Sequence, residues 1–150
     1  MGDFFMTRNI DALNDIYQNA EMGIVGINDV LYKIKNDKLK KELEKVKKDF
    51  GKILRRCEKL LKDYKCKPKK INFMAKMSSE FYSEMKLTKE NSDDIIIKMM
   101  IEGSYKSVGI LTTKLMEFDS VDMDVKSLAE KLLDLINDNI SRLKKFDKIC

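Results

Sequence analysis

The chain has 150 residues, of which 43% are hydrophobic and 37% are charged, and its formal net charge is +5. It contains no histidine, so the commonest metal ligand and the commonest general base are both missing, and catalytic arrangements that require histidine are excluded. The three cysteines are an odd number without metal-ligand spacing, which argues against a disulfide framework and a zinc site. No run of about 18 apolar residues occurs, and the start, MGDFFMTRNID, does not resemble a signal peptide. We therefore expect a soluble, cytoplasmic protein with reduced thiols.

The low content of turn-forming residues favours long helices. Only six Gly and one Pro are present, and both residue types destabilise a helix when they lie in its interior. A chain of this length is sufficient for one hydrophobic core without crosslinks. We expect a single domain spanning residues 1–150.

The first predicted helix begins near Asn9 or Asp11, because either side chain can cap a helix N-terminus. Its apolar residues recur at spacings of three and four, which is a heptad seam. The seam consists of Ile10, Leu13, Tyr17, Ala20, Ile24, Ile27, Leu31 and Ile34. The polar pair Asn36 and Asp37 interrupts it and predicts a tight connection, with Asp37 capping the second helix.

The second predicted helix repeats the heptad pattern. Its seam consists of Leu39, Leu43, Val46, Phe50, Ile53, Cys57, Leu60 and Tyr64. Two long seams joined by so short a link predict an antiparallel helix hairpin. Gly51 lies off the seam and suggests a close approach by a neighbouring element, and the run KCKPKK, with Pro68, ends the helix.

A shorter amphipathic segment, residues 71–87, predicts a crossover helix with four large apolar residues on one face, Met74, Met77, Phe81 and Met85. The following polar stretch, TKENSDD, predicts a break, with Asn91 and Ser92 as the leading N-caps.

Two further long helices complete the pattern. The third, within residues 95–118, has the seam Ile97, Ile101, Ser104, Val108, Leu111, Leu115 and Phe118. A turn is predicted at residues 119–124, DSVDMD, before the fourth helix. The apolar face of the fourth helix consists of Val125, Leu128, Leu132, Leu135, Ile136, Ile140, Leu143 and Phe146. The predicted fold class is all-α, an up-down four-helix bundle of two antiparallel hairpins joined by a crossover helix.

Three segments of the sequence resemble one bacterial protein family. The segments NAEMGIVGINDVLYKIKNDKLKKELEKVKKDF and MMIEGSYKSVGILTTKL, with MAKMSSEFYSEMKL between them, resemble bacterial ferritin-like domains of unknown function, distant relatives of rubrerythrin and ferritin. The resemblance covers nearly the whole chain and implies a ferritin-like bundle. Ferritins hold two iron ions with one Glu from each of two helices and a Glu-x-x-His motif from each of the others. This chain departs from that pattern at every histidine, so the resemblance implies the family's fold without its di-iron site.

Two carboxylates border the predicted core. Glu21 follows Ala20, and Glu102 follows Ile101, so each lies about 100° round the helix from its seam. If they met inside the bundle, they would form part of a carboxylate-only iron or manganese site, although such a site needs about four inward carboxylates. The alternative is that both are packing-edge residues that pair with lysines, such as Lys106. We favour the edge interpretation and expect no cofactor.

A basic stretch is the second candidate site. Residues 33–70 contain 17 Lys or Arg against six Asp or Glu, a net charge of +11, and since the whole chain carries +5 the remainder sums to −6. Such a face is able to meet nucleic acid, an anionic membrane surface or an acidic protein. The scarcity of arginine in this stretch and the lack of aromatic residues on its exposed face argue against nucleic acid or a membrane, and a plain solvated face is the favoured interpretation. The candidate anion-binding residues are Lys40, Lys41, Lys47, Lys48, Arg55 and Arg56.

The leading functional interpretation is a non-catalytic structural or protein-interaction module that self-associates, most simply as a dimer. Self-association is predicted because apolar residues flank the seams and one bundle would leave them partly exposed, namely Ile16, Val25, Val30 and Leu54. Two alternatives stay open. One is iron or manganese storage or oxidation through Glu21 and Glu102, and the other is binding of anionic polymers through the lysine-rich second helix.

Overall fold

The computed structural model describes residues 2–69 and 93–147. These residues form four long α-helices, α1 (Gly2–Leu31), α2 (Asp37–Asp63), α5 (Asp93–Glu117) and α6 (Met123–Phe146), with a short 3-10 helix, η1 (Phe118–Ser120), before α6. No strand occurs within the described ranges. The predicted crossover helix at residues 71–87 and the predicted caps Asn91 and Ser92 lie outside the described residues.

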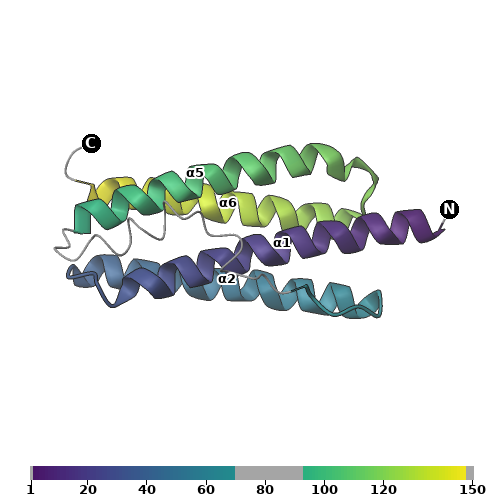
Figure 1. The fold of residues 1–150 in the computed structure, drawn as a ribbon, viewed down its shortest axis with the longest axis horizontal. Coiled ribbons are helices and arrows are strands. Elements are labelled where there is room, and N and C mark those ends of the chain that lie inside the picture. Colours follow the sequence, from purple (N-terminus) through teal and green to yellow (C-terminus); the bar gives the residue numbers. More distant parts are fainter. Residues whose placement is uncertain (1, 70–92, 148–150) are drawn as a thin grey trace.

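The helices form two antiparallel hairpins, α1 with α2 and α5 with α6, that pack against each other (Figure 1). Contacts at the two ends of the bundle define the directions of the helices. At one end, the carboxylate of Asp93, where α5 begins, accepts hydrogen bonds of 2.9 Å from the backbone amides of Lys35 and Asn36, just before α2. At the other end, Arg8 of α1 donates to the backbone carbonyl of Glu117, where α5 ends. Thus α2 and α5 run parallel, and the predicted all-α four-helix bundle is confirmed.

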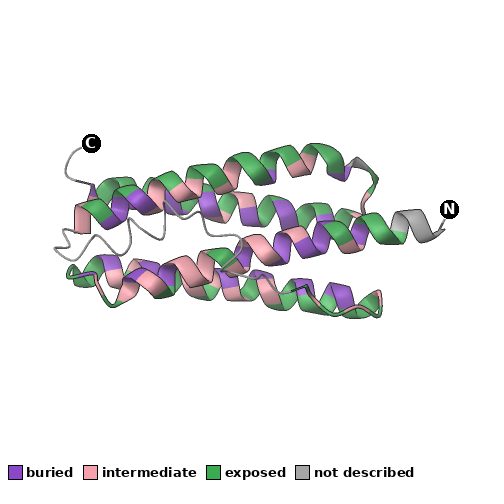
Figure 2. Ribbon diagram, in the orientation of Figure 1, coloured by how far each residue is buried: buried purple, intermediate pink, exposed green. Residues whose placement is uncertain are grey.

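The seams predicted for the second and fourth long helices form much of the hydrophobic core, whereas only Ile97, Leu111 and Phe118 of the seam predicted within residues 95–118 are buried. Buried and exposed positions alternate along each helix (Figure 2). In α2, every seam residue from Leu39 to Leu60 is buried, and Tyr64 is half-buried. In α6, Leu135 and Phe146 are half-buried and the other predicted residues are buried. Each fully buried aliphatic side chain contributes about 1.5–3 kcal/mol relative to an exposed one, so these seams supply most of the favourable energy of folding.

The predicted start of the first helix is wrong, because α1 begins at Gly2 and includes both Asn9 and Asp11. Asn9 does not cap the helix. Its side chain is fully buried, and its Oδ1 accepts a hydrogen bond of 2.7 Å from the backbone amide of Asp122. A contact with the other hairpin therefore uses the oxygen that the sequence suggested for capping.

The predicted cap of the second helix is also wrong by one residue. Asn36, rather than Asp37, caps α2, because its Oδ1 accepts hydrogen bonds from the amides of Lys38 (2.9 Å) and Leu39 (3.2 Å). The fourth helix begins at Met123, inside the turn predicted at residues 119–124. Asp122 precedes it, and its carboxylate accepts a hydrogen bond from the Tyr64 hydroxyl instead of capping the helix.

The C-terminus of α2 ends in a Schellman motif. Lys65 adopts a left-handed conformation (φ 59°), the amide of Cys66 donates to the carbonyl of Leu61, and the amide of Lys65 donates to that of Lys62, both at 2.9 Å. The helix has therefore ended before Pro68 is reached. The chain then turns back along α1.

Two side chains of α1 hold the returning segment. The backbone amide of Lys69 donates to Asn14 Oδ1 (2.9 Å), and the Gln18 side chain donates to the Lys69 carbonyl (3.2 Å). Asn14 is buried, so this contact satisfies a polar side chain inside the bundle. Residues that follow α2 are thereby attached to the first helix.

The predicted close approach at Gly51 is wrong, since a Cβ there would meet only the Arg55 guanidinium at 3.5 Å. The close approach lies at Gly23 of α1, where a Cβ would be 2.7 Å from the Phe50 ring of α2. Any larger residue at Gly23 would therefore collide with a ring that is itself buried in the core.

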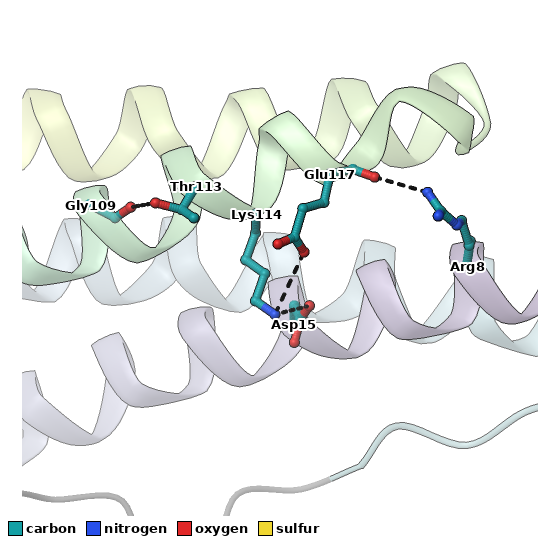
Figure 3. A network of polar contacts seen from close by, with 6 residues as sticks. All are labelled: Arg8, Asp15, Gly109, Thr113, Lys114 and Glu117. Carbon is teal, nitrogen blue, oxygen red and sulfur yellow. Dashed lines mark hydrogen bonds and ion pairs between the residues drawn. The ribbon is translucent and has the colours of Figure 1, made fainter.

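Polar contacts join α1 to α5 near the end of α5 (Figure 3). The Lys114 ammonium lies 3.9 Å from the Asp15 carboxylate of α1 and 4.0 Å from the Glu117 carboxylate. On the same stretch of α5, the Thr113 hydroxyl donates to the Gly109 carbonyl (2.9 Å), one turn earlier in the helix. These ion pairs are partly exposed, so each contributes no more than about 1 kcal/mol.

Candidate functional site

The solvent-facing side of α2 consists entirely of charged residues. All 13 exposed positions between Asp37 and Asp63 carry a formal charge, nine as Lys or Arg and four as Asp or Glu. The large hydrophobic residues that are exposed elsewhere in the described chain do not occur on this helix. The face therefore offers charge and offers no apolar contact surface.

Seven of these cations form one row, here named the cationic stripe. Each follows a buried seam position by two residues, which places it about 200° round the helix and therefore on the side opposite the core. The row keeps the heptad spacing of the seam and faces solvent at every position. The cationic stripe consists of Lys41, Lys45, Lys48, Lys52, Arg55, Lys59 and Lys62.

The cationic stripe is only weakly neutralised by the protein itself. Within the described residues, Lys52 is its one member with an ion-pair partner, the Asp49 carboxylate at 3.7 Å. Two exposed carboxylates, Glu44 and Glu58, lie within the span of the stripe, while Asp37 and Asp63 lie at the ends of the helix. The stripe thus keeps a net positive field, which attracts anions.

The six predicted anion-binding residues do not share one face. Lys41, Lys48 and Arg55 belong to the cationic stripe, and all three are exposed. Lys40 and Lys47 are half-buried, and Arg56, although exposed, is rotated about 100° from Arg55. Sequence reasoning missed the other four members of the stripe, although the repeated offset of two residues from the seam was visible in the sequence.

Glu21, the first predicted metal ligand, lies at the α1–α2 interface beside the buried Tyr17. Burial raises the pKa of Tyr17, and the nearby carboxylates of Glu21 and Glu58, which are within hydrogen-bonding reach of the hydroxyl, raise it further. The structure therefore brings Glu21 to Tyr17 and Glu58, a grouping that sequence reasoning did not anticipate.

Glu102, the second predicted ligand, is exposed on α5. Within residues 2–69 and 93–147, no three Asp, Glu, Cys or His side chains gather in a way that would hold a metal ion. The seam residues of α2 that face the interior of the bundle are apolar. The described residues thus do not fit a di-iron or di-manganese centre, which needs about four carboxylates directed inward.

Cys57 is a buried thiol. Burial raises its pKa to about 12, with a further contribution from the Glu58 carboxylate, so the thiol stays protonated and unreactive at neutral pH. Cys66 is half-buried and packs against the core after the Schellman turn, rather than lying on the open surface.

The residues that motivated self-association divide into two groups. Ile16 and Val30 are fully buried, at 0% and 2% exposure, because α1 turns a broad apolar face toward the other helices. Val25 and Leu54 are half-buried. Two of the four residues therefore give no reason to expect an oligomer, and self-association stays a prediction.

Comparisons of the chain with protein-family models, curated proteins and solved structures found no match. The resemblance to ferritin-like domains therefore rests on the sequence phrases alone. In the part of the chain that the structure describes, no helix is both long enough and apolar enough to cross a membrane.

Proposed function

We propose that this protein is a non-catalytic helical bundle that binds a polyanion through the cationic stripe of α2. The observation that supports this proposal is the unbroken row of seven exposed cations at heptad spacing, on a helix whose other side forms part of the core. A rigid helix holds these charges in line, so binding does not have to order a flexible segment.

The proposal treats the buried polar side chains as structural rather than catalytic. The buried polar residues of the described chain are Asn9, Asn14, Asn139 and Asp147. Asn9 and Asn14 accept hydrogen bonds from backbone amides, which stabilises the tertiary structure. We further propose that the four helices have ferritin-like connectivity, in which the second and third long helices run parallel, as α2 and α5 do.

Affinity for a generic polyanion tests the proposed function. Heparin coupled to a column is a suitable probe, with the salt concentration of elution as the readout. Replacing three stripe residues, Lys41→Gln, Lys48→Gln and Arg55→Gln, is expected to lower that concentration, because three of the seven aligned charges are lost. We name this protein the stripe variant.

A matched control separates the cationic stripe from net charge. The α6 variant removes three exposed cations from another helix, Lys126→Gln, Lys131→Gln and Lys145→Gln, and has the same net charge as the stripe variant. It should elute close to the unmodified protein. If both variants shift equally, or if the unmodified protein is not retained, the proposed function is wrong.

A further inference from the structure

The dimensions of the cationic stripe restrict what it is able to bind. From Lys41 to Lys62 the helix advances 21 residues, which is roughly 31 Å at 1.5 Å per residue. The stripe therefore presents one cation about every 5 Å along a straight line. Six of the seven are lysines, whose long flexible side chains place a point charge and do not form the fixed two-point contacts of arginine.

The side-chain chemistry of α2 argues against three classes of partner. Single-stranded nucleic acids bind by stacking their bases on aromatic side chains, and the outer face of α2 has none. Peripheral membrane helices insert an apolar face, and protein interfaces have an apolar centre depleted of charge. All 13 exposed positions of α2 are charged, so neither arrangement is available.

A nucleic-acid duplex requires only charge. Its phosphates are bound by lysines irrespective of base sequence, and this contact alone accounts for non-specific affinity. Asn, Gln, Ser and Thr, which commonly read base edges or bind phosphate by hydrogen bonds, are absent from α2. At 3.4 Å per base pair, the stripe runs along about nine base pairs, which is almost one turn of the duplex, so it crosses both phosphate strands.

We propose that the polyanion is the phosphate backbone of a nucleic-acid duplex, bound independently of its base sequence. This inference rests on the proposed function and makes its partner specific. The distribution of charge orients the complex, since residues 33–70 carry +11 and the rest of the chain −6. The more acidic remainder is repelled by the phosphates, so α2 is the side that faces the duplex.

Fluorescence anisotropy of a labelled duplex of about 20 base pairs, titrated with the full chain over a series of salt concentrations, measures this binding directly. If all seven cations reach phosphates, the logarithm of the binding constant falls against the logarithm of salt with a slope near −6. The stripe variant should show a slope shallower by about 2.7 and an affinity at least tenfold weaker at about 50 mM salt. The α6 variant should match the unmodified protein.

Further probes separate failure of this inference from failure of the proposed function. Two duplexes of unrelated sequence should bind equally, and a tenfold preference between them would overturn sequence-independent binding. If single strands with the same number of phosphates, or vesicles containing anionic phosphatidylserine, bind at least as tightly, the duplex is not the partner, although the polyanion function stands. If the unmodified protein is not retained on the heparin column either, both proposals are wrong. Circular dichroism of each variant checks that these exposed substitutions leave the helices folded.

Discussion

Helices α2 and α5 are similar in length but differ in how they use their apolar residues. In α2, 17 of 27 residues are charged, yet eight residues are buried. In α5, only seven of 25 residues are charged, yet four are buried. The difference shows that segregation of apolar residues to one side of a helix, rather than their number, determines how much core a helix supplies.

The apolar residues of α5 are distributed around the helix. Ile110 and Met116 are 60% and 76% exposed, and Tyr105 is 48% exposed beneath the Lys144 ammonium of α6, which lies 5.2 Å from the ring centroid. The seam predicted for this helix is accordingly half-buried at Ile101 and Val108. The outer side of α2, in contrast, is free to carry charge because its core residues are confined to the other side.

Truncation of one large apolar residue in each helix, buried in α2 and exposed in α5, should give the largest contrast. Leu43→Ala in α2 removes a side chain with 0% exposure and should lower the free energy of unfolding by about 2–5 kcal/mol, because a cavity forms in a packed interior. Ile110→Ala in α5 should change it by no more than about 0.5 kcal/mol. Urea unfolding followed by circular dichroism measures both, and equal losses would contradict the comparison.

Alanine at two helical glycines should have effects of opposite sign. Gly23→Ala places a methyl group against the Phe50 ring of α2 and should destabilise the protein by about 1–3 kcal/mol. Gly109→Ala in α5 meets no atom within 4 Å and should stabilise it by about 0.5–1 kcal/mol, since alanine is the better helix former. Thermal unfolding of both variants tests this. Stabilisation by Gly23→Ala would show that α1 and α2 are not closely packed there.

A smaller effect than that of Leu43→Ala is expected at the contact between the end of α2 and the turn that follows α5. Burial, the hydrogen bond to Asp122 and the charges of Asp122, Asp124 and Asp63 raise the pKa of Tyr64 to about 12. Tyr64→Phe should cost about 0.5–1.5 kcal/mol at pH 7, because the hydrogen bond is lost.

The pH dependence of the Tyr64→Phe effect follows from the direction of the pKa shift. The folded pKa lies above the ordinary value of 10.0, so the stabilisation by Tyr64 is complete below pH 10 and is lost as the pH rises toward 12. Urea unfolding at pH 7, 9 and 11 should therefore show a shallower alkaline decline in the variant. The raised pKa values of Tyr17 and Cys57 act in both proteins, so the difference between them isolates Tyr64. If stability declined equally steeply with pH in the variant and in the unmodified protein, the raised pKa of Tyr64 would be contradicted.

The sequence by itself determined the four long helices and the core positions of α2 and α6. Each is a periodic pattern of neighbouring residues, and helix geometry alone converts such a pattern into a face. The stripe was recognisable in the same way, since it repeats the seam two residues later.

Only the tertiary structure decided which polar and small residues meet across the bundle. Asn9 accepts a hydrogen bond from the backbone amide of Asp122 rather than capping a helix, and Gly23 rather than Gly51 allows the close approach. Glu21 of α1 and Glu58 of α2 both lie beside the Tyr17 hydroxyl. These pairs are far apart in the chain, and their meeting depends on the rotation and axial offset with which the helices dock. A local pattern specifies which side of a helix is buried, whereas packing against the other helices specifies what lies opposite each residue.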